Sequence, residues 1–481
     1  MKIKVQKFKL FSYSYFLSFV LLLTSCYKDK GNYEYDMPVE PVVKNLDTLY
    51  NIMVGDSLII SPTFENIADE DIDCTWEIAV PEAVDPSYYT FQGKALRIVF
   101  GLQAKLYYAR LTLLNKSNGI KYFYDFKIQG KTEFSAGYLV LSEEEGKTQL
   151  SFVRPNGEVL PRIYELINLK PLPENPLSIH YLANKFTGNT PLGYWIICKE
   201  EGIRLDVNNL KQEELKPGSI TDNFFLAPNK IEIGSFQTHP QGVLMGIING
   251  KFYGGITTTW DQAQTYGMFG SYADGDYELH DKFILTNIND NISIIAFERN
   301  RKQFLRFNIY GSVTYFGTQY SVTNSSIFDP TNIGMDLLNI VQINNTDTYA
   351  FCQDANKNIY ELKFNVNFYG PFTFTPLHKR NFVNPQIITE KTKMLATKTG
   401  IIYIASGNKV YSYTPINQNL QEIATKFNDE VTMLKLSDDE QTLIIGSGSS
   451  IYFTNISTGN NGVLIDTIEG IPGSSIDITW R

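Results

Sequence analysis

The stretch GIIYIASGNKVYSY, residues 400–413, decides the fold, because a second version of it, QTLIIGSGSSIYFT, follows at residues 441–454. Each version is an apolar run, a turn of small residues and a strand in which apolar and polar side chains alternate. Gly407 and Gly448 supply the positive φ that a tight β-hairpin turn needs. A hairpin that recurs at about 40 to 50 residues is typical of a β-propeller, whose blades bury their faces against one another.

The strand that follows the tight turn recurs along most of the chain, at spacings of 41 to 55 residues. Its copies are residues 150–152, 203–205, 252–253, 304–307, 359–362, 410–413 and 451–453. We therefore predict that residues 132–481 form an all-β propeller of seven blades, with six or eight blades as the alternatives.

The last residues of the chain form a strand that has no place in the last blade. Residues 431–470 already supply the strands of that blade, and Ile476, Ile478 and Trp480 alternate with polar residues after them. The first blade, by contrast, shows only three strands, in residues 137–166. We predict that the spare strand is the innermost strand of the first blade, which closes the ring and leaves no open sheet edge.

Residues 38–131 predict a second, smaller all-β unit. Its strands are short, helical periodicity is absent, and Val54-Gly55-Asp56 and Ser117-Asn118-Gly119 mark turns. About ninety residues of such strands are typical of an Ig-like β-sandwich. Trp76 lies in the middle of a predicted strand, where we expect it in the core, with a sugar-binding platform as the alternative.

The first 25 residues predict a signal peptide. Four lysines precede an apolar run, residues 10–23, that is shorter than the roughly 20 residues of a spanning helix. Leu23-Thr24-Ser25-Cys26 looks like a bacterial lipobox, whose cysteine is acylated and becomes the first mature residue. We therefore predict a lipid anchor at Cys26 and a tether over residues 26–37; the alternative is an ordinary signal peptide with a chance cysteine.

The bulk composition indicates a folded protein that does not bind nucleic acid. Hydrophobic residues make up 43% of the chain and charged residues 19%. The net charge is −9, and removal of the leader with its four lysines and no acid takes it to −13. Cys74, Cys198 and Cys352 remain in the mature chain, and we predict that they are buried apolar side chains without a disulfide framework.

Sequence motifs for catalysis, metals and cofactors are missing. The four histidines are scattered, and no G-x-S-x-G, P-loop or dinucleotide-binding glycine motif occurs. The acidic run at residues 69–73 lacks the spacing and the glycine of a calcium loop. We predict a protein that is not an enzyme and that holds no cofactor or metal. A catalytic carboxylate pair assembled from different blades would leave no such motif, so a hydrolase is the alternative.

The insertion at residues 257–281 is the strongest candidate for a binding surface. It holds Trp260, Tyr266, Phe269 and Tyr272 among glycines and acidic residues. Rigid aromatic rings in a glycine-rich loop provide contact area at low entropic cost, for sugar faces or for apolar peptide side chains. In the alternative interpretation the loop folds its aromatic rings onto its own blade.

Arg299 and Arg301 form a local basic cluster in an acidic protein, in the predicted hairpin turn of the fourth blade. They could meet a carboxylate or an acidic partner. A solvated turn without a binding role is the alternative.

The mature chain resembles the PKD-like surface lipoproteins that accompany SusC/SusD-type outer-membrane transporters. The resemblance is carried by CYKDKGNY at residues 26–33, the turn at 54–56, Trp76 and the segment GYLVLS at 137–142. It implies a lipid-anchored protein of the outer membrane that faces the cell exterior. It also implies a PKD-like sandwich and a SusC/SusD-like transporter and neighbouring lipoproteins as partners.

We therefore expect an accessory protein that binds oligomeric nutrient without catalysis, with a peptide favoured over an oligosaccharide as the ligand. A surface hydrolase with its site at the propeller mouth is one alternative. A purely structural adaptor, in which Trp260 and its neighbours contact protein, is the other.

Overall fold

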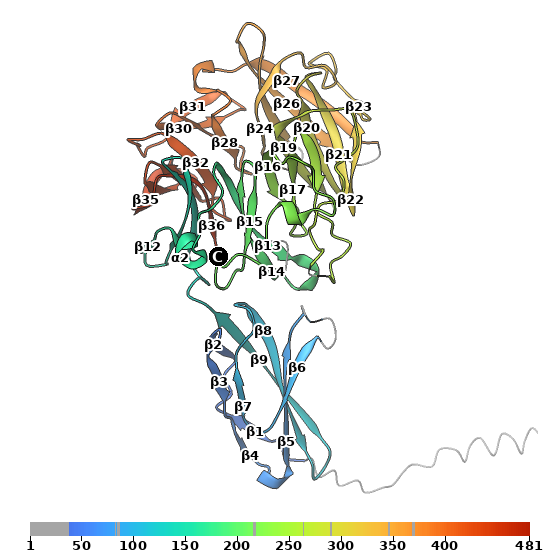
Figure 1. Ribbon diagram of the computed structural model, residues 1–481, viewed down its shortest axis with the longest axis vertical. Coiled ribbons are helices and arrows are strands. Elements are labelled where there is room, and N and C mark those ends of the chain that lie inside the picture. The colour runs from blue at the N-terminus through green and yellow to red at the C-terminus, as the bar shows by residue number, and fades with distance from the viewer. Residues whose placement is uncertain are drawn as a thin grey trace, which may run out of the picture.

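The computed structural model describes residues 38–481 apart from 82, 84–86, 215–217, 263, 289–290, 345–346 and 368–370. The predicted signal peptide, Cys26 and the tether lie outside the described residues. No helix within the described part of the chain combines the length and the apolar character of a membrane span. The described residues form two bodies joined end to end, an elongated sandwich and a ring of sheets (Figure 1).

The sandwich is built from one large sheet that faces two short ladders. The large sheet has the order β2 (Leu49–Met53), β9 (Lys121–Lys131), β8 (Leu106–Asn115), β5 (Ile72–Ala79) and β6 (Tyr88–Gln92). The ladders are β1 (Val42–Lys44) with β4 (Thr63–Glu65), and β3 (Ser57–Ile60) with β7 (Leu96–Val99). A 3-10 turn, η1 (Asp69–Asp71), precedes β5. β2 pairs with β9 in parallel, and the other pairs are antiparallel.

The alternation of side chains along β5 builds the core of the sandwich. Cys74, Trp76 and Ile78 are buried, while the residues between them face outward. The Trp76 indole Nε1 donates to the carbonyl of Gly93 at 2.7 Å, and its ring meets Phe126 edge-on. The prediction of Trp76 as a core residue is confirmed.

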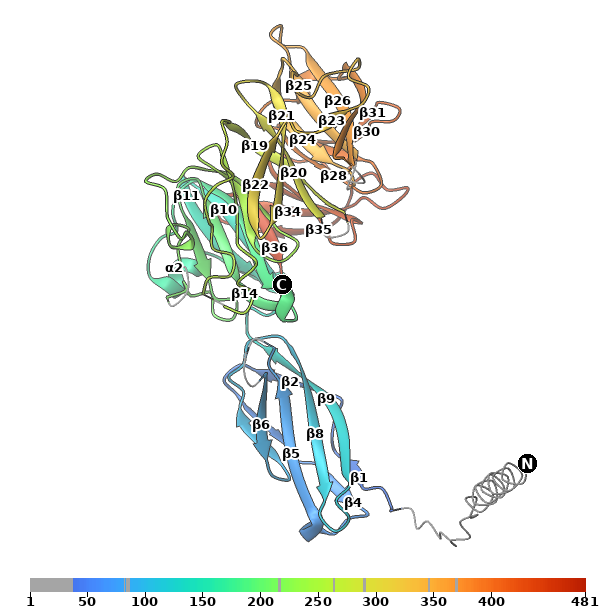
Figure 2. The ribbon, with the colours of Figure 1, turned by 90° about the vertical axis from the view of Figure 1, so that its right-hand side faces the viewer.

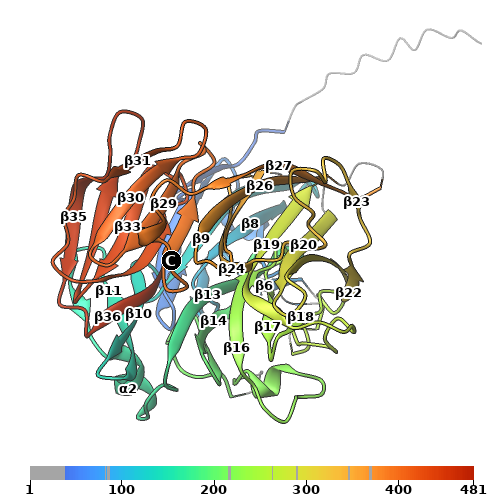
Figure 3. The same ribbon diagram turned by 90° about the horizontal axis from the view of Figure 1, so that it is seen from above.

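Seven sheets in the described residues stand around a common axis, which confirms the propeller (Figure 3). In chain order, the strands of the first four blades are β10 (Tyr138–Glu144), β11 (Lys147–Val153) and β12 (Val159–Leu160); β13 (Pro176–Asn184), β14 (Thr190–Cys198) and β15 (Gly202–Leu205); β16 (Ile233–Thr238), β17 (Leu244–Ile248) and β18 (Lys251–Gly254); and β19 (Leu279–Ile288), β20 (Asn291–Glu298), β21 (Gln303–Tyr310) and β22 (Ser312–Gly317). Those of the last three are β23 (Ser321–Val322), β24 (Asp336–Gln342), β25 (Asp347–Gln353), β26 (Ile359–Asn367) and β27 (Thr373–Asn381); β28 (Lys393–Ala396), β29 (Ile402–Ser406), β30 (Lys409–Thr414) and β31 (Asn419–Glu422); and β32 (Val431–Leu436), β33 (Thr442–Ser447), β34 (Ser450–Asn455) and β35 (Val463–Glu469).

The final strand closes the ring as predicted. β36 (Ser474–Trp480) pairs antiparallel with β10, so that Tyr138 lies opposite Trp480 and Val140 opposite Ile478. The first sheet therefore has the order β12-β11-β10-β36, with the last strand innermost. β36 also adjoins the inner strands β13 and β32 of the two neighbouring blades.

The outer part of the first blade differs from the sequence-based prediction. The third strand was expected to reach residue 166, but β12 ends at Leu160 and the helix α2 (Ile163–Asn168) follows. Ile163 and Tyr164 turn into the core between the first two blades, so that a helical turn buries side chains that a continued strand would expose. The 3-10 turn η3 (Thr221–Asn223) follows the second blade. Two other 3-10 turns are η2 (Lys185–Thr187) and η4 (Pro385–Ile387).

The C-terminal arginine lies at the junction of the two bodies (Figure 1). Arg481 donates to the carbonyl of Ala104 in the sandwich at 3.1 Å and to that of Phe134 in the connecting segment at 3.4 Å. It also donates to the carbonyl of Val207 in the second blade. We call the end of the propeller at this junction the proximal mouth and the opposite end the distal mouth. The strands β1 and β4 lie at the end of the sandwich remote from the propeller (Figure 2).

Candidate ligand-binding site in the propeller channel

The inner strands of the propeller enclose a cavity of about 380 Å³ in the central channel. Side chains link neighbouring inner strands, since Gln237 of β16 donates to the carbonyl of Phe283 in β19, and Gln342 of β24 donates to Thr286 Oγ1 of β19. Each inner strand begins at the distal mouth and ends at the proximal one, where β36 reaches Arg481. The cavity is lined mainly from the middle of these strands and, on the distal side, from the segment 390–392 that precedes β28; we call it the distal cavity. Its lining residues come from β16, β19, β24, β28, β32, β36 and the segment 390–392.

The charged side chains of this cavity are mostly lysines. Lys282, Lys391 and Lys393 line it, together with Glu390 and Asp477. The Asp477 carboxylate is already neutralised, because the Lys435 ammonium lies 2.7 Å from its Oδ1 and the backbone N–H of Ile179 donates to its Oδ2 at 2.9 Å. The cavity thus carries an excess of positive charge in a protein whose net charge is −9. Such a site attracts an anion.

Lys282 is the most perturbed of these lysines. Its pKa is lowered to about 8, mainly by burial and in addition by the positive charge of the neighbouring Lys393. Its ammonium group donates to the carbonyl of Leu338 at 3.4 Å, a long bond that leaves other donor positions available. A carboxylate in the cavity would offset both the desolvation and the repulsion, so ligand binding and protonation of Lys282 reinforce each other.

A neutral histidine lies beside this cavity on β13. The ring of His180 contacts Ser178 Oγ at 2.9 Å through Nε2 and Thr238 Oγ1 at 3.3 Å through Nδ1. Burial lowers its pKa to about 4. At neutral pH the imidazole therefore adds a polar group but no charge to the channel.

Trp260 and Tyr272, two of the predicted binding residues, are partly exposed. The Trp260 side chain is 47% exposed at the proximal mouth, where its ring centroid lies 6.3 Å from that of Phe186. Asn184 at the end of β13 donates to the Trp260 carbonyl at 2.9 Å and fixes the loop there. Tyr272 is 38% exposed, and its ring packs edge-on against Tyr253 of β18.

Tyr266 and Phe269 are buried, which corrects their predicted role in binding. The Tyr266 hydroxyl donates to the carbonyl of Gln241 at 2.6 Å, and burial raises its pKa to about 12. Phe269 has no exposed surface and stacks on Phe236. Its backbone bridges to Gly255, so the segment covers the outer edge of a blade for which the described residues form the three strands β16, β17 and β18. Here the loop folds onto its own blade, because that apolar edge needs a cover.

Arg299 and Arg301 point to aspartates of the insertion and lie on the distal side of the propeller. Arg299 Nη2 lies 3.0 Å from Asp281 Oδ1. Arg301 donates to the backbone carbonyl of Asp276 at 2.9 Å and also pairs with its carboxylate. All four side chains are well exposed, which makes these ordinary surface ion pairs. The structure does not bring the arginines together with Trp260, which lies at the opposite mouth.

No sequence pattern identified the lysines of the channel as residues of a site. Lys282, Lys391 and Lys393 sit in segments with no motif, and only the ring closure brings them to one axis. A usable signal existed in the last strand, where polar Asp477 alternates with apolar residues. Once that strand is innermost, one of its faces must line the channel.

The cysteines and the possible metal ligands offer no further site among the described residues. Cys74, Cys198 and Cys352 are free and buried, as predicted, and burial raises the pKa of the Cys74 thiol to about 11 and that of Cys198 to about 12. Among the described residues we find no group of three or more His, Cys, Asp or Glu side chains that could hold a metal ion.

The comparison with known families covers the N-terminal third of the chain. Residues 26–176 match the PKD-like family. The match spans the sandwich and the strands β10, β11 and β12 of the first blade, and it ends where β13 begins. No curated relative matches the chain.

Several solved structures are similar to this chain at low identity. A quinonprotein alcohol dehydrogenase-like protein from Bacteroides thetaiotaomicron has 12% identity and a TM-score of 0.39, with 92% of this chain and 99% of that chain covered. A functionally unknown protein from Desulfotomaculum acetoxidans has 13% identity and a TM-score of 0.43, with 72% and 99% covered. The β-propeller domain of Cps50 (Swd1) from Myceliophteria thermophila has 9% identity and a TM-score of 0.38, with 62% and 87% covered. These similarities concern the fold, and we draw no functional argument from them.

Proposed function

We propose that this chain is a cell-surface accessory lipoprotein of a SusC/SusD-like, TonB-dependent uptake complex that binds oligomeric nutrient without catalysing its breakdown. The ligand we favour is a peptide, held by a carboxylate group in the distal cavity of the propeller. The observation that carries the proposal is the excess of lysine around that cavity, where Lys282 and Lys393 gain most from an anionic ligand. Peptides carry a carboxylate at one end, whereas neutral glycans carry none.

The arrangement of the two bodies supports the same role. The predicted anchor at Cys26 precedes β1, which lies at the end of the sandwich remote from the propeller (Figure 2). An acylated Cys26 in the outer membrane would make the sandwich a stalk, with the distal mouth pointing away from the lipid. A ligand from the medium would then reach the cationic cavity first.

Calorimetric titration with peptides tests the ligand. We expect short peptides with a free C-terminal carboxylate to bind, and the same peptides with an amidated C-terminus to bind at least about tenfold more weakly. The Lys282→Met variant should lose a similar factor. Lys398→Met, which removes an exposed lysine paired with Glu440, is the matched control and should bind as the wild type does. Equal binding of free and amidated peptides would contradict the assignment.

Co-purification tests the partner. Detergent extracts of outer membranes that contain the full chain should yield a TonB-dependent transporter on affinity capture. A chain that is recovered without any transporter would count against the accessory role, whatever the outcome of the peptide titration. Labelled fatty acid should be incorporated into the wild type and be lost in Cys26→Ala.

The two alternatives predict different results. A surface hydrolase would turn over peptide or glycan substrates at the distal cavity, where Glu390 and Asp477 supply carboxylates. A structural adaptor would use Trp260 and Phe186 at the proximal mouth. In that case Trp260→Ala should abolish capture of the transporter and leave peptide binding unchanged.

A further inference from the structure

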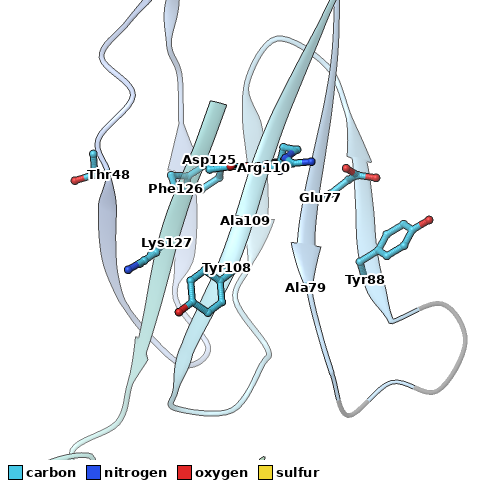
Figure 4. A pocket seen from close by; sticks show the side chains of 10 residues that line it. All are labelled: Thr48, Glu77, Ala79, Tyr88, Tyr108, Ala109, Arg110, Asp125, Phe126 and Lys127. Carbon is cyan, nitrogen blue, oxygen red and sulfur yellow. Dashed lines mark hydrogen bonds and ion pairs between the residues drawn. The ribbon is translucent and has the colours of Figure 1, made fainter. Parts of the chain in front are cut away.

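A second hollow, of about 660 Å³, lies on the outward face of the large sheet in the sandwich (Figure 4). It is larger than the channel cavity and belongs to the other body of the molecule. Its lining residues come from β5, β6, β8 and β9 and from the segment before β2, and those whose side chains face the hollow include Glu77, Ala79, Tyr88, Tyr108, Arg110, Asp125 and Lys127.

The register of the strands explains why the sheet is hollow here. Ala79 of β5 lies opposite Tyr88 of β6. On the other side of β5, Ile78 lies opposite Ala109 of β8, which places Ala79 beside Tyr108. A methyl group therefore sits between two tyrosine rings on strands two positions apart, at a distance of roughly 10 Å. The rings form the walls of a trough, and Ala79 forms its floor.

Both rings present a face to solvent. Tyr108 is 64% exposed and Tyr88 46%. The Lys127 ammonium lies 5.4 Å from the centroid of the Tyr108 ring, on the neighbouring strand β9. This contact helps to hold the ring in an upright position. Exposed rings with a fixed orientation are suited to stack on a flat ligand surface.

A row of charged groups runs beside the tyrosines. Glu77, Arg110 and Asp125 lie opposite one another on β5, β8 and β9. Arg110 Nε is 2.7 Å from Asp125 Oδ1, so this pair is already formed without a ligand. With Lys127, the hollow holds two acids and two bases. Unlike the channel cavity, it has no charge excess that would select an anion.

We propose that this hollow binds a neutral oligosaccharide. The two tyrosine rings would stack on the C–H faces of successive sugar units. Glu77 and Asp125 would accept hydrogen bonds from hydroxyl groups, while Arg110 and Lys127 would donate to hydroxyl oxygens. The charge balance fits a ligand that is rich in hydroxyl groups and carries no charge.

A peptide fits this face less well. Extended peptides add to the open edge of a sheet through backbone hydrogen bonds. The backbone groups under the hollow are already paired, since β8 and β5 each have a partner strand on both sides. A protein surface docked here would have to bury two acids and two bases, which costs desolvation energy. The proposal is independent of the peptide site in the propeller, because no lining residue is shared.

Affinity electrophoresis of the full chain in detergent tests the proposal. The gels would contain xyloglucan, galactomannan, arabinogalactan or dextran as neutral polysaccharides, and polygalacturonate as a charged one. We expect retardation by at least one neutral polysaccharide, and a dissociation constant at least about tenfold higher for Tyr108→Ala and for Tyr88→Ala. Ala79→Leu fills the trough without removing a ring, and it should block binding as well.

Tyr89→Ala is the matched control. Tyr89 is 45% exposed, almost as much as Tyr88, but it lies opposite Ile78 and so faces the other side of the sheet. Its removal should leave retardation unchanged. The proposal is overturned if no neutral polysaccharide retards the chain, if only polygalacturonate does, or if Tyr89→Ala and Tyr108→Ala have the same effect. Binding of casein peptides that is lost in Tyr108→Ala would also overturn it.

Discussion

The sandwich and the propeller bury their apolar side chains in different ways. The described part of the sandwich has one cluster, which joins buried residues of the large sheet, such as Trp76, to buried residues of its cover, such as Leu58. The described part of the propeller has seven clusters, and each is shared by two adjacent blades. A defect in the sandwich therefore affects the whole of a small core, whereas a defect in the ring affects one of several interfaces, unless it opens the ring itself.

Deletion of residues 473–481 should have the largest effect. It removes β36, unpairs β10 and takes Ile478 out of the cluster between the last blade and the first. We expect loss of most of the stability of the propeller, about 5–15 kcal/mol, while the sandwich keeps its own transition in scanning calorimetry.

Trp480→Ala is the control for this deletion, since it keeps the strand and removes a ring that is half exposed and packs on Tyr138. It should shift the transition of the propeller only slightly. A melting temperature that is unchanged by the deletion would disprove the closure of the ring.

Trp76→Ala should have the next largest effect and should be confined to the sandwich. Removal of a fully buried indole leaves a cavity in a single core, at a cost of about 3–5 kcal/mol. Trp76→Phe loses the hydrogen bond to Gly93 and only part of the buried ring, so it should cost less, about 1–3 kcal/mol. If the propeller transition moves as far as that of the sandwich, the two bodies do not unfold separately.

Acid should destabilise the propeller more than the sandwich, because all four histidines lie in the propeller. His239 is buried, its Nδ1 accepts the backbone N–H of Gln241 at 3.1 Å, and burial lowers its pKa to about 4. Since this value lies below that of the unfolded chain, near 6.5, the unfolded state takes up the proton first as the pH falls.

The contribution of His239 is therefore complete above about pH 6.5 and is lost progressively down to about pH 4, by up to about 3 kcal/mol. Burial shifts the pKa of His180 and His280 in the same direction. Urea unfolding at pH 7.5 and pH 4.5 should show a larger loss for the propeller than for the sandwich. His239→Gln should reduce the difference, and an equal loss in both bodies would contradict the assignment.

Arg481→Ala should have the smallest effect on stability and a clear effect on geometry. Its guanidinium joins carbonyls of the sandwich, the connecting segment and the second blade. We expect a loss of about 1–2 kcal/mol and a wider distribution of angles between the two bodies in small-angle scattering. An unchanged scattering profile would show that Asn208, which accepts the N–H of Ala104 at 3.0 Å, holds the junction without the arginine.

The repeat in the sequence predicted the ring because a blade needs an alternating hairpin, and residues 400–413 and 441–454 keep it almost unchanged. The spare strand at the C-terminus predicted the closure for the same reason. The outer edges were harder, since α2 follows β12 in the first blade and a coil that contains Phe269 covers the third. Local pattern does not determine what covers an edge.

The candidate site depended on long-range geometry to a greater degree. Lys282 and Lys393 lie far apart in the sequence, and they line one cavity because both lie on inner strands of the closed ring. Among the predicted binding residues, Trp260 and Tyr272 are exposed, while Tyr266 and Phe269 are in the core. Composition identified a loop rich in aromatic residues, but whether each ring faced solvent depended on the open edge beside it.

The pairing of β10 with β36 also determines when the ring can close during synthesis of the chain. The earliest strand of the ring cannot pair with its inner neighbour until the last nine residues have been synthesised. For all that time its edge is available to wrong partners, so the unfinished chain would profit from a chaperone that covers this edge. A fusion tag appended after Arg481 would have to leave through the crowded junction, and a tag placed in a distal hairpin would not disturb this last step.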